Sequence, residues 1–150
     1  EYSIPELKKF IGCEIGLSDW IMIDQGRINK FAKLTEDEQF IHINPERASK
    51  ETPFGGTIAH GFLTLSMLVK LAESVLPKII DVKVTINYGF DKIRFIYPVA
   101  ANSKLRARFI LKEVEERSPK QIMTKWDVSV EIKNVDKPAI VATWINLLMF

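Results

Sequence analysis

The chain has 150 residues, of which 47% are hydrophobic and 27% charged, and its formal net charge is +2. This length and composition allow a buried core without disulfides, so we expect a single domain over residues 1–150. The small net charge, with basic and acidic residues well mixed, argues against nucleic-acid or membrane-surface binding. The single cysteine, Cys13, cannot form an internal disulfide and no secretory leader is visible, so we expect a cytoplasmic protein.

Helices are predicted in the first half of the chain. Apolar residues at helical spacing indicate a short N-terminal helix over residues 2–11. A second helix should begin after Asp24, a good N-cap, and end near residues 35–37. Its predicted buried face consists of Ile28, Phe31, Ala32 and Leu34.

A third helix and a loop are predicted next. Asn44 as cap and Pro45 in the first turn indicate a brief helix to about residue 49. The proline and paired glycines of residues 52–56 predict a loop of fixed shape. Residues 57–76 then form the longest helical pattern, and we expect its first three turns to be buried all round. Its uncharged apolar stretch is far shorter than the roughly 20 residues that cross a bilayer.

Strands are predicted after Pro77, where the hydrophobic period changes to two. We expect them at residues 82–87, 93–97, 105–114, 122–132 and 140–148. The short connections favour antiparallel neighbours, and the element order predicts an α+β fold in which an antiparallel sheet wraps around the central helix. Open sheet edges favour pairing of two chains, so we expect a homodimer. Arg106 and Arg108 are expected on the solvent-exposed face of a strand, although an anionic ligand could also use them.

Candidate chemistry is concentrated in residues 31–67, which contain both histidines of the chain, His42 and His60. Asp37 precedes His42 by five residues, and five helical residues leave two side chains roughly 140° apart. The two can share a site only if the chain leaves the helix between them, so residues 39–42 should form a turn or a short extended piece. Two histidines and a distant cysteine provide no recognisable zinc spacing, and no metal is expected.

Four segments of the chain resemble one known family. They are D-x-x-x-x-H at 37–42, NPERA at 44–48, FGGTIAHGFLTLS at 54–66 and YGFDKIRFIYPV at 88–99. Together they resemble MaoC-like dehydratases, the (R)-specific enoyl-CoA hydratase group, and most closely its nodulation-protein-N-like branch. The resemblance extends over roughly residues 18–148. It implies a hot-dog fold, a dimer, and a hydro-lyase that hydrates trans-2-enoyl thioesters or dehydrates (R)-3-hydroxyacyl thioesters, carried on coenzyme A or acyl carrier protein, without a cofactor.

The same resemblance implies roles for particular residues. Water must add to C3, a proton must reach C2, and negative charge must develop on the thioester oxygen. Asp37 and His42 would hold the water and move the proton, whereas the backbone N–H of Gly61 would stabilise the oxyanion. Further candidates for substrate binding are Ala59, His60 and Phe62. For His60 a structural hydrogen bond to the 53–56 loop is the favoured alternative.

The sequence also departs from the family pattern and leaves alternatives open. Glu36 and Glu38 flank Asp37, and carboxylates facing the site would raise the proton affinity of Asp37 and His42. Asn44 replaces the usual aspartate, and Val69 stands where some members have serine. One alternative is an acyl-CoA thioesterase, which needs a carboxylate on the long helix, and Glu73 lies too far along it. The other is a non-catalytic acyl-thioester-binding protein, which would not need the Asp37 and His42 pair.

Overall fold

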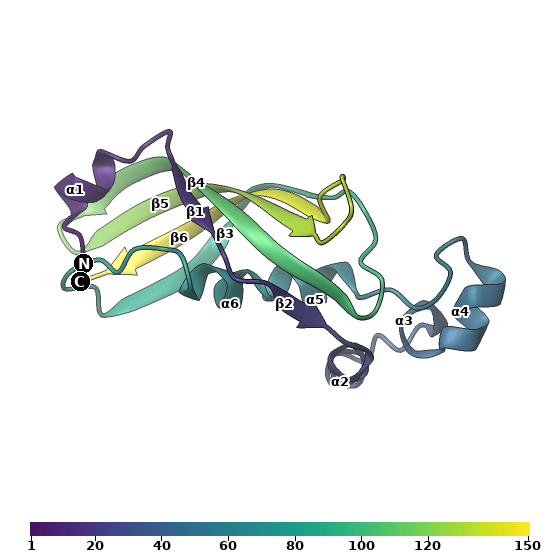
Figure 1. Ribbon diagram of the computed structural model, residues 1–150. Helices are drawn as coiled ribbons and strands as arrows, with labels where there is room; N and C mark the ends of the chain where they lie inside the picture. Colours follow the sequence, from purple (N-terminus) through teal and green to yellow (C-terminus); the bar gives the residue numbers. More distant parts are fainter.

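The computed structural model describes residues 1–150, and its main feature is a six-stranded antiparallel sheet that curves around a central helical segment (Figure 1). The strand order is β1-β4-β5-β6-β3, and β2 also pairs with β4. The four long strands are β3 (Val84–Phe95), β4 (Ser103–Ser118), β5 (Gln121–Ile132) and β6 (Ile140–Met149). The predicted α+β architecture is therefore confirmed.

The central helical segment consists of α5 (Gly61–Ser66) and α6 (Leu68–Glu73), separated at Met67. The prediction of one helix over residues 57–76 was wrong at both ends. Before Gly61 the backbone is held by other segments, since Ile58 N–H donates to Ile41 O at 3.0 Å and Ala59 N–H donates to Val99 O at 2.7 Å. The expected burial on all sides was also wrong, because Phe62 is 68% exposed. The sheet therefore does not cover the face of this helical segment on which Phe62 lies.

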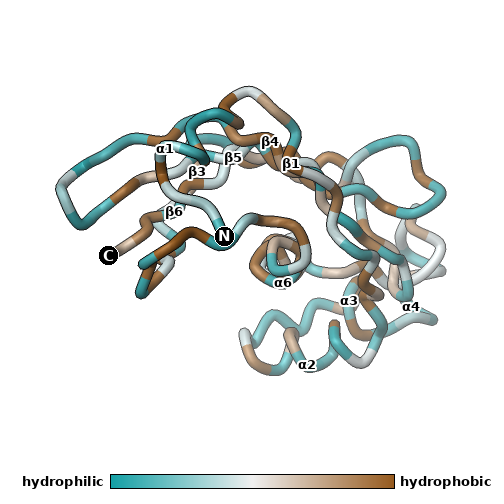
Figure 2. The backbone as a smooth tube through the Cα atoms, turned by 60° about the vertical axis from the view of Figure 1, so that its left-hand side comes forward, coloured by the Kyte–Doolittle hydropathy of each residue, from teal (hydrophilic) through white to brown (hydrophobic).

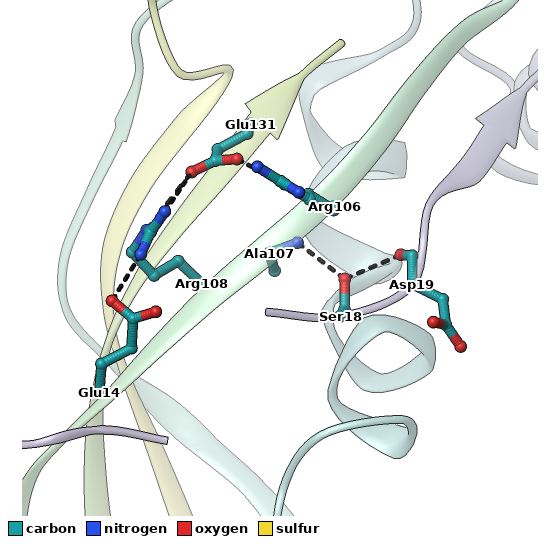
Figure 3. A network of polar contacts seen from close by, with 7 residues as sticks. All are labelled: Glu14, Ser18, Asp19, Arg106, Ala107, Arg108 and Glu131. Carbon is teal, nitrogen blue, oxygen red and sulfur yellow. Dashed lines mark hydrogen bonds and ion pairs between the residues drawn. The ribbon is translucent and has the colours of Figure 1, made fainter. Parts of the chain in front are cut away.

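The N-terminal segment adds α1 (Ile4–Lys8), shorter than predicted, and two strands that the sequence did not predict, β1 (Glu14–Leu17) and β2 (Ile21–Ile23). Both pair with β4. Between them, the Ser18 N–H donates to Ala107 O, and the Ala107 N–H donates to the hydroxyl oxygen of Ser18 (Figure 3). On the outer face of β4, Arg106 and Arg108 pair with Glu131, and Arg108 also pairs with Glu14. Their predicted place on the solvent-exposed face of a strand is confirmed, and their charges are matched within the chain.

Three further helices lie on the concave side of the sheet, beyond the central helical segment (Figure 2). They are α2 (Gln25–Thr35), α3 (Phe40–Ile43) and α4 (Pro45–Glu51). The predicted caps are confirmed, because Asp24 accepts from Arg27 N–H and Asn44 accepts from Arg47 N–H. Leu34 was wrongly placed in the core, since it is 83% exposed on the outer side of α2. Residues 40–43 form a helical turn, α3, instead of the expected turn or extended piece.

The edge strand β3 corrects a further prediction, because residues 82–87 and 93–97 were expected as two separate strands. They belong to one strand with register shifts after Asn87 and after Phe90. The two shifts interrupt the alternation only between Asn87 and Lys92, so one strand has the sequence pattern of two strands with a gap between them. Asn102 has a left-handed backbone, with φ of 71°. None of the helices combines the length and apolar content required to cross a bilayer.

Candidate active site

The two histidines of the chain stack on each other although they come from different elements. His42 lies in α3 and His60 caps the start of α5, and their ring centroids are 3.8 Å apart with planes inclined by 22°. Both are buried, with 6% and 3% of their surface exposed. Phe31 of α2 packs against His60 at 4.9 Å between ring centroids. The fold therefore brings together two residues that were separate candidates in the sequence.

The ring of His42 is fixed by one hydrogen bond. Its Nδ1 lies 2.7 Å from Ile58 O, and because a carbonyl only accepts, Nδ1 must donate a proton. The neutral tautomer then has its lone pair on Nε2. Burial lowers the pKa of His42, and the neighbouring His60 lowers it further, whereas the bond to Ile58 and the carboxylate of Asp37 oppose the shift. The ring is therefore uncharged at neutral pH and able to accept a proton at Nε2.

The backbone around His42 is held by polar side chains that the sequence analysis missed. Gln25 Nε2 donates to His42 O at 2.7 Å, and the hydroxyl of Thr57 donates to Gln25 Oε1. Thr57 is itself buried. A lone glutamine in the first turn of a helix carries no signal of such a contact in the sequence. Its role becomes visible only when α2, α3 and the segment before α5 are placed together.

His60 connects the ring of His42 to the segment that carries Asp37. Its Nε2 donates to the backbone O of Asp37 at 2.9 Å, rather than to the 53–56 loop. The other ring nitrogen, Nδ1, is buried and has no hydrogen-bond partner. His60 thus contacts both members of the predicted pair, one by stacking and the other through its main chain.

Asp37 completes the cluster. A carboxylate oxygen of Asp37 and one ring nitrogen each of His42 and His60 all lie within 4.8 Å of one another. Asp37 can reach them because Glu36 ends α2 in a left-handed conformation with φ of 62°. α2 ends before Asp37 and α3 begins only at Phe40, so Asp37 and His42 do not share one continuous helix, as the 140° argument required. Asp37 is the one carboxylate among the groups that shift the pKa of His42; Glu36 and Glu38 are not among them.

The three groups are also chemically suited to a metal ion, which the sequence spacing did not indicate. The stacking argues for another use. Lone pairs of imidazole lie in the ring plane, and two stacked rings direct them along nearly parallel planes instead of toward one point. This arrangement suits proton transfer better than tetrahedral coordination.

Gly61 is the first residue of α5, and amides of a first helical turn have no acceptor within the helix. A Cβ at this position would lie 2.8 Å from Cδ1 of Phe95, so any larger residue here would require the Phe95 ring to move. Phe62 and Phe95 pack edge to face beside it at 5.9 Å. The Gly61 amide therefore lies next to an exposed apolar surface. Ala59 is buried and its N–H is used by Val99, and its predicted contact with substrate stays a prediction.

The sheet curved around a helix is a hot-dog scaffold, and the carboxylate and imidazole beside the start of that helix form a candidate acid–base site. Comparison with known proteins agrees with this class. Residues 6–133 match the family described as "MaoC like domain". The chain belongs to the MaoC-like dehydratase family, and the predicted family and hot-dog fold are confirmed.

Individual relatives agree with the branch that the sequence motifs indicated. The chain is 47% identical to "Nodulation protein N" of Rhizobium leguminosarum bv. viciae over 150 residues, covering 100% of this chain and 93% of that protein. It is 41% identical over 140 residues to "3-hydroxyacyl-thioester dehydratase Z" of Mycobacterium tuberculosis, covering 93% and 91%. The solved structure of the (R)-hydratase from A. caviae has the same fold, with a TM-score of 0.68, 21% identity and coverage of 87% and 95%.

Proposed function

We propose that this protein adds water to trans-2-enoyl thioesters, and removes it from (R)-3-hydroxyacyl thioesters, with the water held between Asp37 and His42. The observation that carries the proposal is the convergence of the Asp37 carboxylate and the fixed His42 ring within 4.8 Å. The 41% identical relative named as a 3-hydroxyacyl-thioester dehydratase supports the same reaction class.

The residues supply what this reaction requires. The oxygen of the water bonds to C3 as Nε2 of His42 or the carboxylate of Asp37 takes a proton, and a proton is delivered to C2. The electron pair of the alkene moves toward the thioester carbonyl, whose oxygen becomes negative, and the Gly61 N–H donates to that oxygen. In the reverse direction the same groups return the water.

We also propose that His60 positions the pair instead of reacting. It stacks on His42 and donates to Asp37 O, so it fixes both residues at once. His60 is itself buried at the start of α5, with 3% of its surface exposed.

The working form is proposed to be a homodimer. β3 lies at an open edge of the sheet, and its outward residues Val84, Ile86 and Tyr88 are exposed. Pairing of two β3 edges would continue the sheet and cover the open face of α5, where Phe62 lies. The thioester would be carried on coenzyme A or acyl carrier protein.

The alternatives receive less support. Glu73, the only carboxylate of α6, is exposed and pairs with Lys70 at 2.7 Å, at the opposite end of the helical segment from His60. This placement disfavours a thioesterase. A protein that only binds thioesters has no need for a histidine with a fixed tautomer beside an aspartate.

The test is hydration of crotonyl-CoA and longer enoyl-CoAs, followed as loss of enoyl absorbance, with the configuration of the product determined. We expect an (R)-product, and a fall in kcat/KM of about 10²–10⁴-fold for Asp37→Asn and for His42→Gln. Glu38→Gln, an exposed neighbour of Asp37, is the matched control and should keep wild-type activity. Release of free thiol would indicate the thioesterase, and inertness at every chain length would indicate the binding protein.

A further inference from the structure

A cavity of about 800 Å³ lies between the sheet and the far end of α6, and the reaction at His42 does not use it. Its walls are Val69, Ala72 and Leu76 on one side, and the inner face of β3, β5 and β6 on the other. Figure 1 shows this end of the molecule near both chain termini, away from α3 and α4. Its volume is within the range of about 300–1,000 Å³ that small-molecule sites have.

The sheet wall of this cavity contains a row of polar residues. Asn87 of β3, Asn146 of β6 and Thr124 of β5 are directly opposite one another across three neighbouring strands. The row lies between the cross-strand pair Trp126 and Trp144 and the aliphatic pair Ile122 and Leu148. Asn146 is 3% exposed and Thr124 is 2% exposed. Polar residues thus replace apolar ones in the middle of an otherwise apolar inner face.

Hydrogen bonds within the chain leave this row incomplete. Asn146 Nδ2 donates to Asn87 Oδ1 at 3.2 Å, and Trp126 Nε1 donates to the hydroxyl oxygen of Thr124 at 3.0 Å. The carbonyl end of the Asn146 carboxamide accepts no bond from the chain, and the hydroxyl proton of Thr124 has no acceptor. Turning the carboxamide around would leave the other end unpaired instead. Both residues line the cavity, so a ligand that displaces water from it must supply the missing bonds.

The cavity and the candidate active site lie at the two ends of the same helical segment. Phe62, Leu65 and Val69 follow one another at helical spacing, and Val69 lines the cavity. Gly61 and Val69 are separated by about 12 Å along the helix. With carbon–carbon bonds of about 1.5 Å, an acyl chain on the order of ten carbons spans this distance.

We infer that the cavity receives the distal end of the acyl chain and selects chains that carry a hydroxyl group there over unsubstituted chains. This inference rests on the proposed function. A hydroxyl both donates and accepts, so it can bond to the Asn146 carboxamide in either orientation and to the hydroxyl of Thr124. An unsubstituted chain of equal length would displace water from these groups and leave them unpaired, and this difference is the source of selectivity.

The test is binding of two saturated acyl-CoAs of about twelve carbons, one with a terminal hydroxyl and one without, so that no hydration occurs. Binding is followed by tryptophan fluorescence in a Trp20→Phe background, because Trp126 and Trp144 line the cavity and Trp20 lies elsewhere. We expect both fluorescence quenching and a Kd at least about tenfold lower for the hydroxylated chain.

Two substitutions test whether Asn146 and Thr124 cause the preference for the hydroxylated chain. Asn146→Leu and, independently, Thr124→Val should bring the ratio of the two Kd values close to one. Ser129→Val, on the outer face of the same strand as Thr124, should keep the wild-type ratio. Should Asn146→Leu fail to fold, Thr124→Val carries the test alone.

The outcomes separate this inference from the proposed function. Equal Kd values in the wild type, or binding without quenching, overturn the inference while hydration of enoyl-CoAs still supports the proposed function. A preference for the hydroxylated chain that Asn146→Leu and Thr124→Val leave unchanged also overturns it. A preference that these variants abolish, in a protein that hydrates no enoyl-CoA, keeps the cavity as a binding site and refutes the reaction.

Discussion

Replacing His60 with leucine separates the stability of the fold from the geometry of the candidate site. The histidine is 3% exposed, donates one hydrogen bond to Asp37 O, stacks on His42, and leaves its Nδ1 without a partner. Leucine has a similar size and fills the same space, but it has no hydrogen-bonding groups. The substitution therefore removes one favourable bond and one unfavourable burial together.

The contributions of these changes to the free energy of unfolding nearly cancel. Loss of the hydrogen bond costs about 1 kcal/mol, and water replaces it because Asp37 is exposed. Loss of ring stacking costs about 1 kcal/mol. Removal of the buried, unpaired Nδ1 returns about 1–3 kcal/mol. We expect the free energy of unfolding of His60→Leu to stay within about 1 kcal/mol of the wild-type value.

Activity should respond differently. Without His60 the main chain of Asp37 loses its anchor, and displacement of a reacting group by about 1 Å can cost 10²-fold. We expect kcat to fall by about 10–100-fold with little change in KM. His60→Gln, whose amide can donate to Asp37 O, should restore part of the loss. Urea unfolding and enoyl-CoA kinetics measure the two effects. A loss of stability above about 3 kcal/mol, or an unchanged kcat, would refute the reasoning.

Three further predictions concern protonation, the oxyanion and assembly. Because burial lowers the pKa of His42 in the folded protein, the unfolded chain binds one more proton below the ordinary pKa of 6.5, and the free energy of unfolding should fall as the pH falls through that value. Urea unfolding at several pH values should show a shallower fall for His42→Gln than for the wild type, and equal slopes would contradict this. Gly61→Ala should lower kcat/KM by about 10–100-fold, less than outright loss of an oxyanion donor. Changing Phe95 to alanine as well should not restore kcat/KM, since the new Cβ at position 61 itself blocks the thioester. Recovery of activity in the double variant would instead show that the effect is only a clash with the Phe95 ring. Light scattering should give twice the chain mass for the wild type and a smaller mass for Ile86→Lys combined with Tyr88→Lys on β3, whereas a monomeric wild type would refute edge pairing.

Local signals in the sequence were sufficient for the elements that depend on local chemistry. Asp24 and Asn44 cap helices where their side chains predicted it, and Asn102 adopts the left-handed turn. β1 and β2 were missed because strands of four and three residues are too short to show alternation, and they form only by pairing with β4. The segment before Gly61 has an apolar helical pattern, yet it bonds to Ile41 and Val99 and stays extended.

The residues of the candidate site also divide into those that local sequence patterns indicated and those that only the packed structure reveals. Asp37, His42 and Gly61 became candidates through motifs, and the structure agrees that Asp37 and His42 do not lie on one continuous helix. The stacking of His42 on His60 and the support from Gln25 depend on how α2, α3 and α5 pack, which no spacing in the sequence encodes. The polar row of the cavity was missed for a related reason, since Asn146 looks like one polar position in an apolar strand until its neighbours on β3 and β5 are known.

The central claim is that one water molecule is shared by an aspartate and a histidine next to a helix start that binds the thioester oxygen. A crystal structure of the Asp37→Asn variant with bound crotonyl-CoA tests this most directly. We predict the thioester oxygen within hydrogen-bond distance of Gly61 N, and C3 facing an ordered water that contacts Nε2 of His42. A thioester bound elsewhere on the molecule, or with C3 directed away from His42, would contradict the account.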